Sequence, residues 1–154
     1  MHPAKKIVVI LVLLIGTICV TAQKTTTVQK FKPPKVTTVL GKYADSAFIS
    51  PAEAAQLIGT ALKITDSKNN SFVISSYQFA YKRITVSEIE ETGKTYSSND
   101  MVASLFKITP LPPLWLENIK SNIQRGEMFY FFDITVKDGQ GRLFFAPDLK
   151  IYIR

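Results

Sequence analysis

The chain has 154 residues and a formal net charge of +7, from 19 Lys and Arg against 12 Asp and Glu. Its one histidine, His2, and its one cysteine, Cys19, both lie close to the N-terminus. If residues 1–22 are removed as an export signal, the mature chain cannot form a Ser-His-Asp triad, a Cys-His pair or a metal site with His or Cys ligands.

Residues 1–22 have the pattern of a cleavable signal peptide. Two lysines precede an apolar run, Ile7–Val20, and small residues lead to a cleavage site after Ala22. The run is shorter than the roughly 20 apolar residues of a spanning helix, so we expect no retained membrane span, with an uncleaved anchor as the alternative. Lipidation at Cys19 is a third possibility, which the bulky Ile18 disfavours. The sequence thus predicts a periplasmic or extracellular protein.

Residues 23–42 are predicted to be a basic linker. They are rich in Thr and Lys, contain Pro33-Pro34 and lack acidic residues, a composition typical of an extended spacer with polyproline character. Attraction to anionic lipid or polysaccharide is the functional alternative. Residues 43–154 carry 12 basic and 12 acidic residues. Because this domain is neutral and has no basic stripe, we expect no nucleic-acid partner.

The domain of residues 43–154 is predicted to begin with a short helix. Ser50, Pro51 and Glu53 form a helix start with a capping box, and Gly59 ends the helix. A strand over 61–66 and a turn follow. The turn contains a glycosylation sequon, Asn69-Asn70-Ser71, which we interpret as ordinary turn chemistry.

A longer strand is predicted from Phe72. One face of it carries Val73, Tyr77, Phe79 and Tyr81. Near Lys82-Arg83 the apolar positions change phase, which indicates a bulge, a bend or a break between two strands. A polar connection over 88–93 and a helical turn over 100–106 are predicted next.

The last third of the chain is predicted to form a helix and three strands. The helix covers 114–124, and its Trp115 anchors it to the core or, alternatively, forms a ligand platform. The strand over 127–137 is predicted to be central and covered on both sides. Its first face carries Met128, Tyr130, Phe132, Ile134 and Val136, and its second carries Phe129 and Phe131. A turn at 138–141 leads to strands over 143–145 and 149–153. The fold class is therefore α+β, mainly β: a compact β-sandwich-like domain with two short helices.

The domain offers few groups for catalysis. Glu88, Glu90 and Glu91 lie in the polar connection, where solvated charges are typical. Asp133 is expected at the rim of its strand or hydrogen-bonded. We find no phosphate loop and no calcium loop, and we predict a non-enzyme with no catalytic, metal-binding or cofactor-binding residue. A carboxylate-based hydrolase is a minor alternative.

Five segments occur in an order that resembles a known family. They are Ile49-Ser50-Pro51-Ala52-Glu53, the strand from Phe72 to Tyr81, Ile123-Gln124-Arg125-Gly126, the turn Gly139-Gln140-Gly141-Arg142, and the strand from Pro147 to Ile153. Over residues 40–154 the chain resembles the C-terminal domain of the gliding-motility protein (GldM) that forms the periplasmic shaft of the type IX secretion machinery. The resemblance implies a periplasmic, non-catalytic, β-rich domain that contacts other envelope proteins. Since neither a membrane helix nor preceding shaft domains are expected, a stand-alone module is a better interpretation than motor coupling.

Two binding functions follow as hypotheses. The first is protein–protein contact through aromatic-rich strand edges, with Leu149–Ile153 able to accept an added strand if it lies at an edge. The second is a carbohydrate- or peptidoglycan-binding module with an aromatic platform, for which Trp115, Tyr96 and Tyr152 are the candidates. The sequence does not predict the partner or its binding face.

Overall fold

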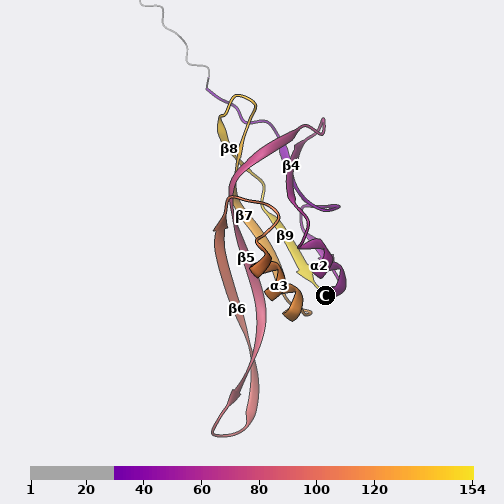
Figure 1. Ribbon diagram of the computed structural model, residues 1–154, viewed down its shortest axis with the longest axis vertical. Coiled ribbons are helices and arrows are strands. Elements are labelled where there is room, and N and C mark those ends of the chain that lie inside the picture. Colours follow the sequence, from indigo (N-terminus) through magenta and orange to yellow (C-terminus); the bar gives the residue numbers. More distant parts are fainter. Residues whose placement is uncertain (1–29) are drawn as a thin grey trace, which may run out of the picture. The chain divides into compact units, whose positions relative to one another are not determined.

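A single sheet of nine strands dominates residues 30–154, which are the residues that the computed structural model describes. The predicted signal peptide lies outside them. The strand order is β2-β1-β4-β5-β7-β9-β3, with β6 beside β5 and β8 beside β7 (Figure 1). The strands are β1 (Val36–Leu40), β2 (Tyr43–Ala44), β3 (Ala47–Ile49), β4 (Leu62–Asp66), β5 (Ser71–Ile89), β6 (Lys94–Phe106), β7 (Met128–Lys137), β8 (Leu143–Ala146) and β9 (Leu149–Ile153).

Two short helices accompany this sheet in the described part of the chain, α2 (Pro51–Leu57) and α3 (Pro113–Asn122). The predicted fold class, mainly β with two short helices, is therefore confirmed. Neither helix is long and apolar enough to cross a membrane.

Helix α2 begins at the position that the sequence predicts, but only the Ser50 half of the predicted capping box forms. The Ser50 hydroxyl caps it by accepting a hydrogen bond from the Glu53 N–H at 3.3 Å, and Pro51 occupies the first helical position. The Glu53 carboxylate does not return to the cap. It accepts from the Tyr43 hydroxyl at 2.5 Å and pairs with Lys42 at 2.8 Å, which ties the helix to the turn after β1.

The domain begins before Tyr43, so the predicted linker over 23–42 is wrong for its last residues. Strand β1 pairs antiparallel with β4 from Val36 opposite Asp66 to Leu40 opposite Leu62. Thr38 and Leu40 are buried, and the Thr38 hydroxyl donates to the carbonyl of Pro147. Threonine and valine are strand-forming residues, and a Thr-rich segment enters a sheet when a partner strand is available.

The core fills the space where the sheet folds back over itself. Leu62 and Ile64 of β4 are buried on one side of this space, and Phe131 of β7 and Ile151 of β9 are buried on the other. The hydrogen bond from Thr38 to the carbonyl before β9 closes the two sides against each other.

Strand β5 continues unbroken through Lys82 and Arg83, where the sequence predicted an irregularity. The register shifts against β7 lie earlier, between Ile74 and Gln78. As a result Val73 is exposed and does not share the buried face of Tyr77, Phe79 and Tyr81. Beyond Lys82, β5 pairs with β6 and no longer with β7. The apolar positions of β5 in this part therefore do not face the core between β5 and β7.

Residues 100–106, predicted to be a helical turn, belong instead to strand β6. This strand pairs with β5 at every position from Lys94 opposite Ile89 to Phe106 opposite Tyr77. Figure 1 shows the β5–β6 hairpin continuing well past the ends of β7 and β9. The pairing with β5 decides this structure, because the local sequence alone carries no strong strand alternation.

Strand β7 is central, as predicted, with β5 on one side and β8 and β9 on the other. Its faces differ from the prediction. Asp133 has a φ of 48° and interrupts the alternation, so the buried residues change phase there. The buried set is Phe129, Phe131, Ile134 and Val136, whereas Met128, Tyr130 and Phe132 are only half-buried.

Strand β9 does not lie at an edge. It pairs antiparallel with β7 and parallel with β3, where Tyr152 is opposite Phe48. The hypothesis that Leu149–Ile153 accepts an added strand is therefore wrong. The clean alternation of Leu149, Ile151 and Ile153 reflects burial between two neighbours.

Candidate functional site

Trp115 anchors helix α3, which confirms the structural role predicted for it. Its ring packs edge-on against Phe106 of β6 and Phe79 of β5, with centroid distances of 5.4 and 5.8 Å. These contacts place α3 over the buried face of β5 and β6. One side of the indole remains on the wall of a surface hollow.

The three aromatic residues proposed for a sugar platform lie on three different elements. Tyr96 is 53 % exposed on β6, opposite Ser87 in the part of the hairpin that extends past β7. Tyr152 lies on β9 and stacks on Phe48. Trp115 is on α3, which covers the face of the sheet opposite to the one that carries Tyr152. The structure does not bring these residues together.

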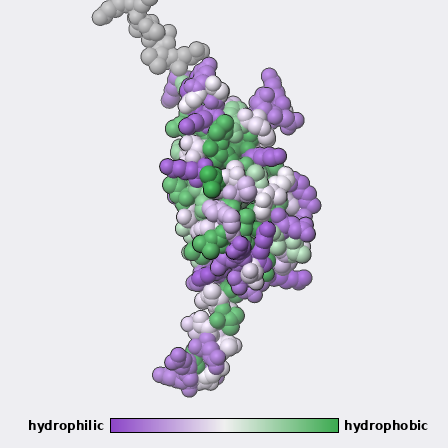
Figure 2. All heavy atoms as spheres, in the orientation of Figure 1, coloured by the Kyte–Doolittle hydropathy of each residue, from purple (hydrophilic) through white to green (hydrophobic). Residues whose placement is uncertain are grey.

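The acidic residues singled out in the sequence are solvated. Glu88, Glu90 and Glu91 are exposed at the tip of the β5–β6 hairpin, where Figure 2 shows a cluster of hydrophilic residues. Asp133 is exposed at the bulge in β7. Within residues 30–154 no three acidic, His or Cys side chains group together in a way that could hold a metal ion.

A groove lies between α3 and the β5–β6 hairpin and consists of two adjoining hollows of about 320 and 440 Å³. Tyr81, Arg83 and Asn118 line both hollows. The smaller hollow is apolar and is lined further by Val102, Leu114, Trp115 and Ile119. The larger is polar and is lined further by Ile84, Thr85, Ser121, Asn122, Gln124 and Glu127. The groove can therefore take an apolar side chain at one end and hydrogen-bonding groups at the other.

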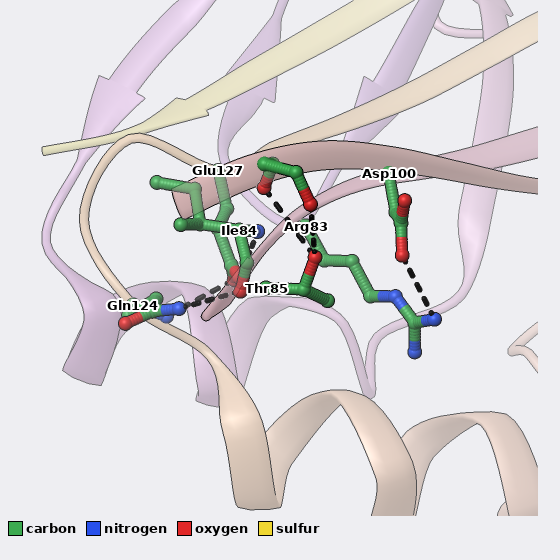
Figure 3. Close-up of polar contacts among 7 residues, drawn as sticks. Arg83, Ile84, Thr85, Asp100, Gln124 and Glu127 are labelled. Atoms are coloured by element: carbon green, nitrogen blue, oxygen red, sulfur yellow. Dashed lines mark hydrogen bonds and ion pairs between the residues drawn. The ribbon is translucent and has the colours of Figure 1, made fainter. Parts of the chain in front are cut away.

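Glu127, which the sequence interpretation missed, is the buried carboxylate of this region, with 2 % of its surface exposed. One of its oxygens accepts from the N–H of Ile84 at 3.1 Å, and the other accepts from the N–H of Gln124 at 3.0 Å and from the Tyr81 hydroxyl. Figure 3 shows the carboxylate pointing between Ile84 and Gln124. Burial raises the pKa of the Tyr81 hydroxyl well above its usual value, and the hydrogen bond to the Glu127 carboxylate is the second cause.

These bonds give Glu127 a structural role. Each of its oxygens already accepts from a protein donor, and together they join the start of β7 to the point where the hairpin leaves the sheet. The only sequence signal is its place as the first residue of the predicted strand, directly after Gly126, and this position does not by itself indicate burial.

Arg83 lines both hollows, and Asp100 of β6 lies opposite it on the neighbouring strand. The Nη2 atom of Arg83 and the Oδ2 atom of Asp100 are 3.3 Å apart, longer than the 2.7–2.9 Å that is typical of charge-assisted bonds (Figure 3). The Nε atom of Arg83 is buried and has no partner within residues 30–154. The pair therefore leaves hydrogen-bonding capacity unused on both groups.

The opposite face of the sheet is apolar and partly exposed, and we call it the open face. Strand register places one row of side chains across five strands: Met101 is opposite Lys82, Lys82 opposite Met128, Met128 opposite Tyr152, and Tyr152 opposite Phe48. The residue four positions along β6 and the residues two and four positions along β7 extend the row, because alternate residues share a face. The apolar residues of the open face are Phe48, Met101, Leu105, Met128, Tyr130, Phe132 and Tyr152, and Lys82 and Gln78 of β5 lie between those of β6 and those of β7. The prediction that β7 is covered on both sides is wrong for this side.

The rings of the open face are stacked in two pairs. Phe48 stacks on Tyr152 at a centroid distance of 4.9 Å, and Tyr130 stacks on Phe132 at 4.7 Å. The guanidinium of Arg154 lies 4.9 Å from the Phe48 centroid, and the ammonium of Lys150 lies 4.7 Å from the Tyr130 centroid. Neighbouring rings and cations thus occupy the ring faces.

Neither a protein-family model, nor a curated protein, nor a solved structure matches this chain. Its function has to be argued from its own residues. The open face and the groove are two features of the described residues that suit binding.

Proposed function

We propose that this chain is an exported, non-catalytic module that binds a protein partner in the cell envelope through its open face. The observation that carries the proposal is the exposure of large apolar side chains on that face: Phe48 is 57 % exposed, Met101 60 % and Leu105 54 %. Several large apolar side chains exposed on one face of a domain mark an interaction site. Aromatic residues, methionine and arginine are also the residue types enriched in protein interfaces.

The arrangement of the rings favours a protein over a carbohydrate partner. A sugar packs flat against the free face of an aromatic ring, whereas the Phe48 and Tyr130 rings each have both a stacked ring and a cation as neighbours. Ring edges and methionine side chains adapt well to the side chains of a protein surface. For these reasons a carbohydrate- or peptidoglycan-binding module ranks second, behind a protein-binding module.

Export and envelope location are parts of the proposal that rest on the sequence. The signal-peptide pattern of residues 1–22 supports export, and the resemblance to the gliding-motility shaft domain supports contact with envelope proteins. The Glu127 carboxylate, with its oxygens engaged by protein donors, supports the non-catalytic part of the proposal.

Site-specific photo-crosslinking in the native host tests this function. A benzophenone amino acid replaces Phe48 on the open face, and in a matched control it replaces Tyr96, which has a similar exposure of 53 % but lies on the distal hairpin. We expect a discrete protein adduct from position 48 and none from position 96. Equal labelling from both positions would show that exposure alone produces the adducts.

A second arm addresses the carbohydrate alternative. The purified chain is mixed with insoluble cell-wall polysaccharide from the same host and sedimented. Retention that is lost when Tyr96 is changed to Ala, together with no adduct from position 48, would replace the proposed function with sugar binding.

A further inference from the structure

We propose that an extended segment of the partner protein adds to the sheet as a new strand along the outer edge of β6. One apolar side chain of that segment enters the hollow beside Val102, and a Lys or Arg two residues away lies beside Asp100. This inference rests on the proposed function, protein binding, and names the element of the partner that is recognised.

The outer edge of β6 is free to pair. Within residues 30–154, β6 pairs with β5 and with no other strand, so the backbone groups on its other side lack sheet partners. The part from Met101 to Phe106 contains no charged residue and no proline, the usual devices that keep a foreign strand away. Six residues of strand give an edge about 20 Å long, enough to pair with a short peptide.

Side chains on both faces beside this edge suit an added strand. Met101 and Leu105 extend the open face to the edge, with 60 % and 54 % of their surface exposed. On the other face Val102 lies at the edge of the apolar hollow, together with Leu114 and Trp115. Since alternate residues of a strand point to opposite faces, an added strand would place apolar side chains on both surfaces at once.

Charge complementarity with Asp100 specifies the Lys or Arg of the added segment. Asp100 precedes Val102 by two residues on the same face of β6, so a residue two positions from the apolar side chain would lie beside it. The Nη2 atom of Arg83 lies 3.3 Å from the Oδ2 atom of Asp100, and within residues 30–154 this carboxylate has no other partner. A Lys or Arg of the segment can pair with it, because opposite charges across neighbouring strands attract.

The experiment uses a displayed library of random ten-residue linear peptides, selected on the full chain. We expect the enriched peptides to share a large apolar residue with Lys or Arg two positions away. Binding of one enriched peptide is followed by the fluorescence of Trp115, the single tryptophan of the chain, which lines the hollow. Hydrogen exchange should show new protection of amides in 101–106.

Matched variants locate the binding site. Val102→Lys places a charge at the hollow and should weaken the peptide about tenfold or more, which corresponds to about 1.4 kcal/mol. Val86→Lys makes the same change at a valine on the distal hairpin, 65 % exposed, and should leave binding unchanged. Asp100→Lys should reject the enriched peptide and accept the version in which its Lys or Arg is replaced by Glu.

Three results would overturn the inference. The first is that the enriched peptides lack this spacing, and the second is that the two valine variants affect binding equally. The third is that the chain alone sediments as a dimer in which the amides of 101–106 are already protected. That third result would assign the edge to a second copy of the chain. If a protein adduct still forms at position 48 in these cases, the proposed function survives without strand addition. Loss of both the adduct and peptide binding would remove the proposed function itself.

Discussion

Replacing Glu127 by Gln tests whether a buried carboxylate fixes the base of the β5–β6 hairpin. The substitution keeps the size of the side chain but converts one acceptor oxygen into an amide donor. In either orientation of the new amide, one backbone N–H, of Ile84 or of Gln124, then faces another donor. A buried N–H without an acceptor costs about 1–3 kcal/mol, and bonds to a neutral group are weaker than bonds to a charged one. We therefore expect E127Q to reduce the free energy of unfolding by about 3 kcal/mol.

The assay is urea unfolding followed by the fluorescence of Trp115, with Glu117→Gln as the control. Glu117 is exposed on α3 and makes no side-chain bond to the sheet, so its variant should remain within about 0.5 kcal/mol of the wild type. For a domain of this size the E127Q melting temperature should fall by roughly 10 °C. The amide of Ile84 should exchange faster in E127Q than in the control. If the two variants unfold at the same urea concentration, the network does not stabilise the hairpin and the reasoning is wrong.

Two further predictions concern Tyr77 and the loop before β7. Burial raises the pKa of Tyr77 to about 12, so the buried phenol stabilises the fold up to pH 10, and this stabilisation is lost as the pH rises from 10 to 12. Urea unfolding at several alkaline pH values should show the loss, and it should be smaller in Tyr77→Phe; an equal loss in both would assign the effect to other groups. Gly126→Ala adds a Cβ that lies 2.8 Å from the Cδ1 atom of Ile84, at a φ of 91°, and should cost about 1–2 kcal/mol in thermal or urea unfolding. Gly139→Ala, where no atom lies within 4 Å and φ is not positive, should cost less than about 0.5 kcal/mol, and equal costs would contradict the steric argument.

Features determined by a few adjacent residues could be predicted from the sequence. The start of α2 follows from Ser50 and Pro51, because a cap and a fixed φ act within one turn of the chain. The turn at 138–141 follows from Asp138, whose carboxylate accepts from the N–H groups of Gln140 and Arg142. The burial of Leu149, Ile151 and Ile153 also follows, since the alternation is complete.

Features determined by a distant partner strand could not be predicted. Residues 100–106 carry no clear alternation and become a strand only because β5 pairs with them. The bulge at Asp133 changes which residues of β7 are buried, and nothing in the apolar pattern of 127–137 places it there. For the same reason the sequence could only offer Leu149–Ile153 as a strand that accepts another if it lies at an edge, whereas β3 pairs with that strand and the free edge within residues 30–154 belongs to β6.

The location of that free edge links the two binding proposals. The open face ends at Met101 and Leu105, which belong to the same strand whose outer edge is free, so a partner that pairs with β6 also reaches these two side chains of the open face. An uncharged edge next to exposed apolar side chains promotes association of any strand that meets it, and proteins normally protect such edges with charge, proline or a covering segment. In this chain Glu88, Glu90 and Glu91 lie at the tip of the hairpin and Asp100 directly precedes the free edge, whereas Met101–Phe106 itself carries no charge. An edge left unprotected beside a matching hollow is what recognition of an extended segment requires, because pairing supplies affinity and the hollow supplies selectivity.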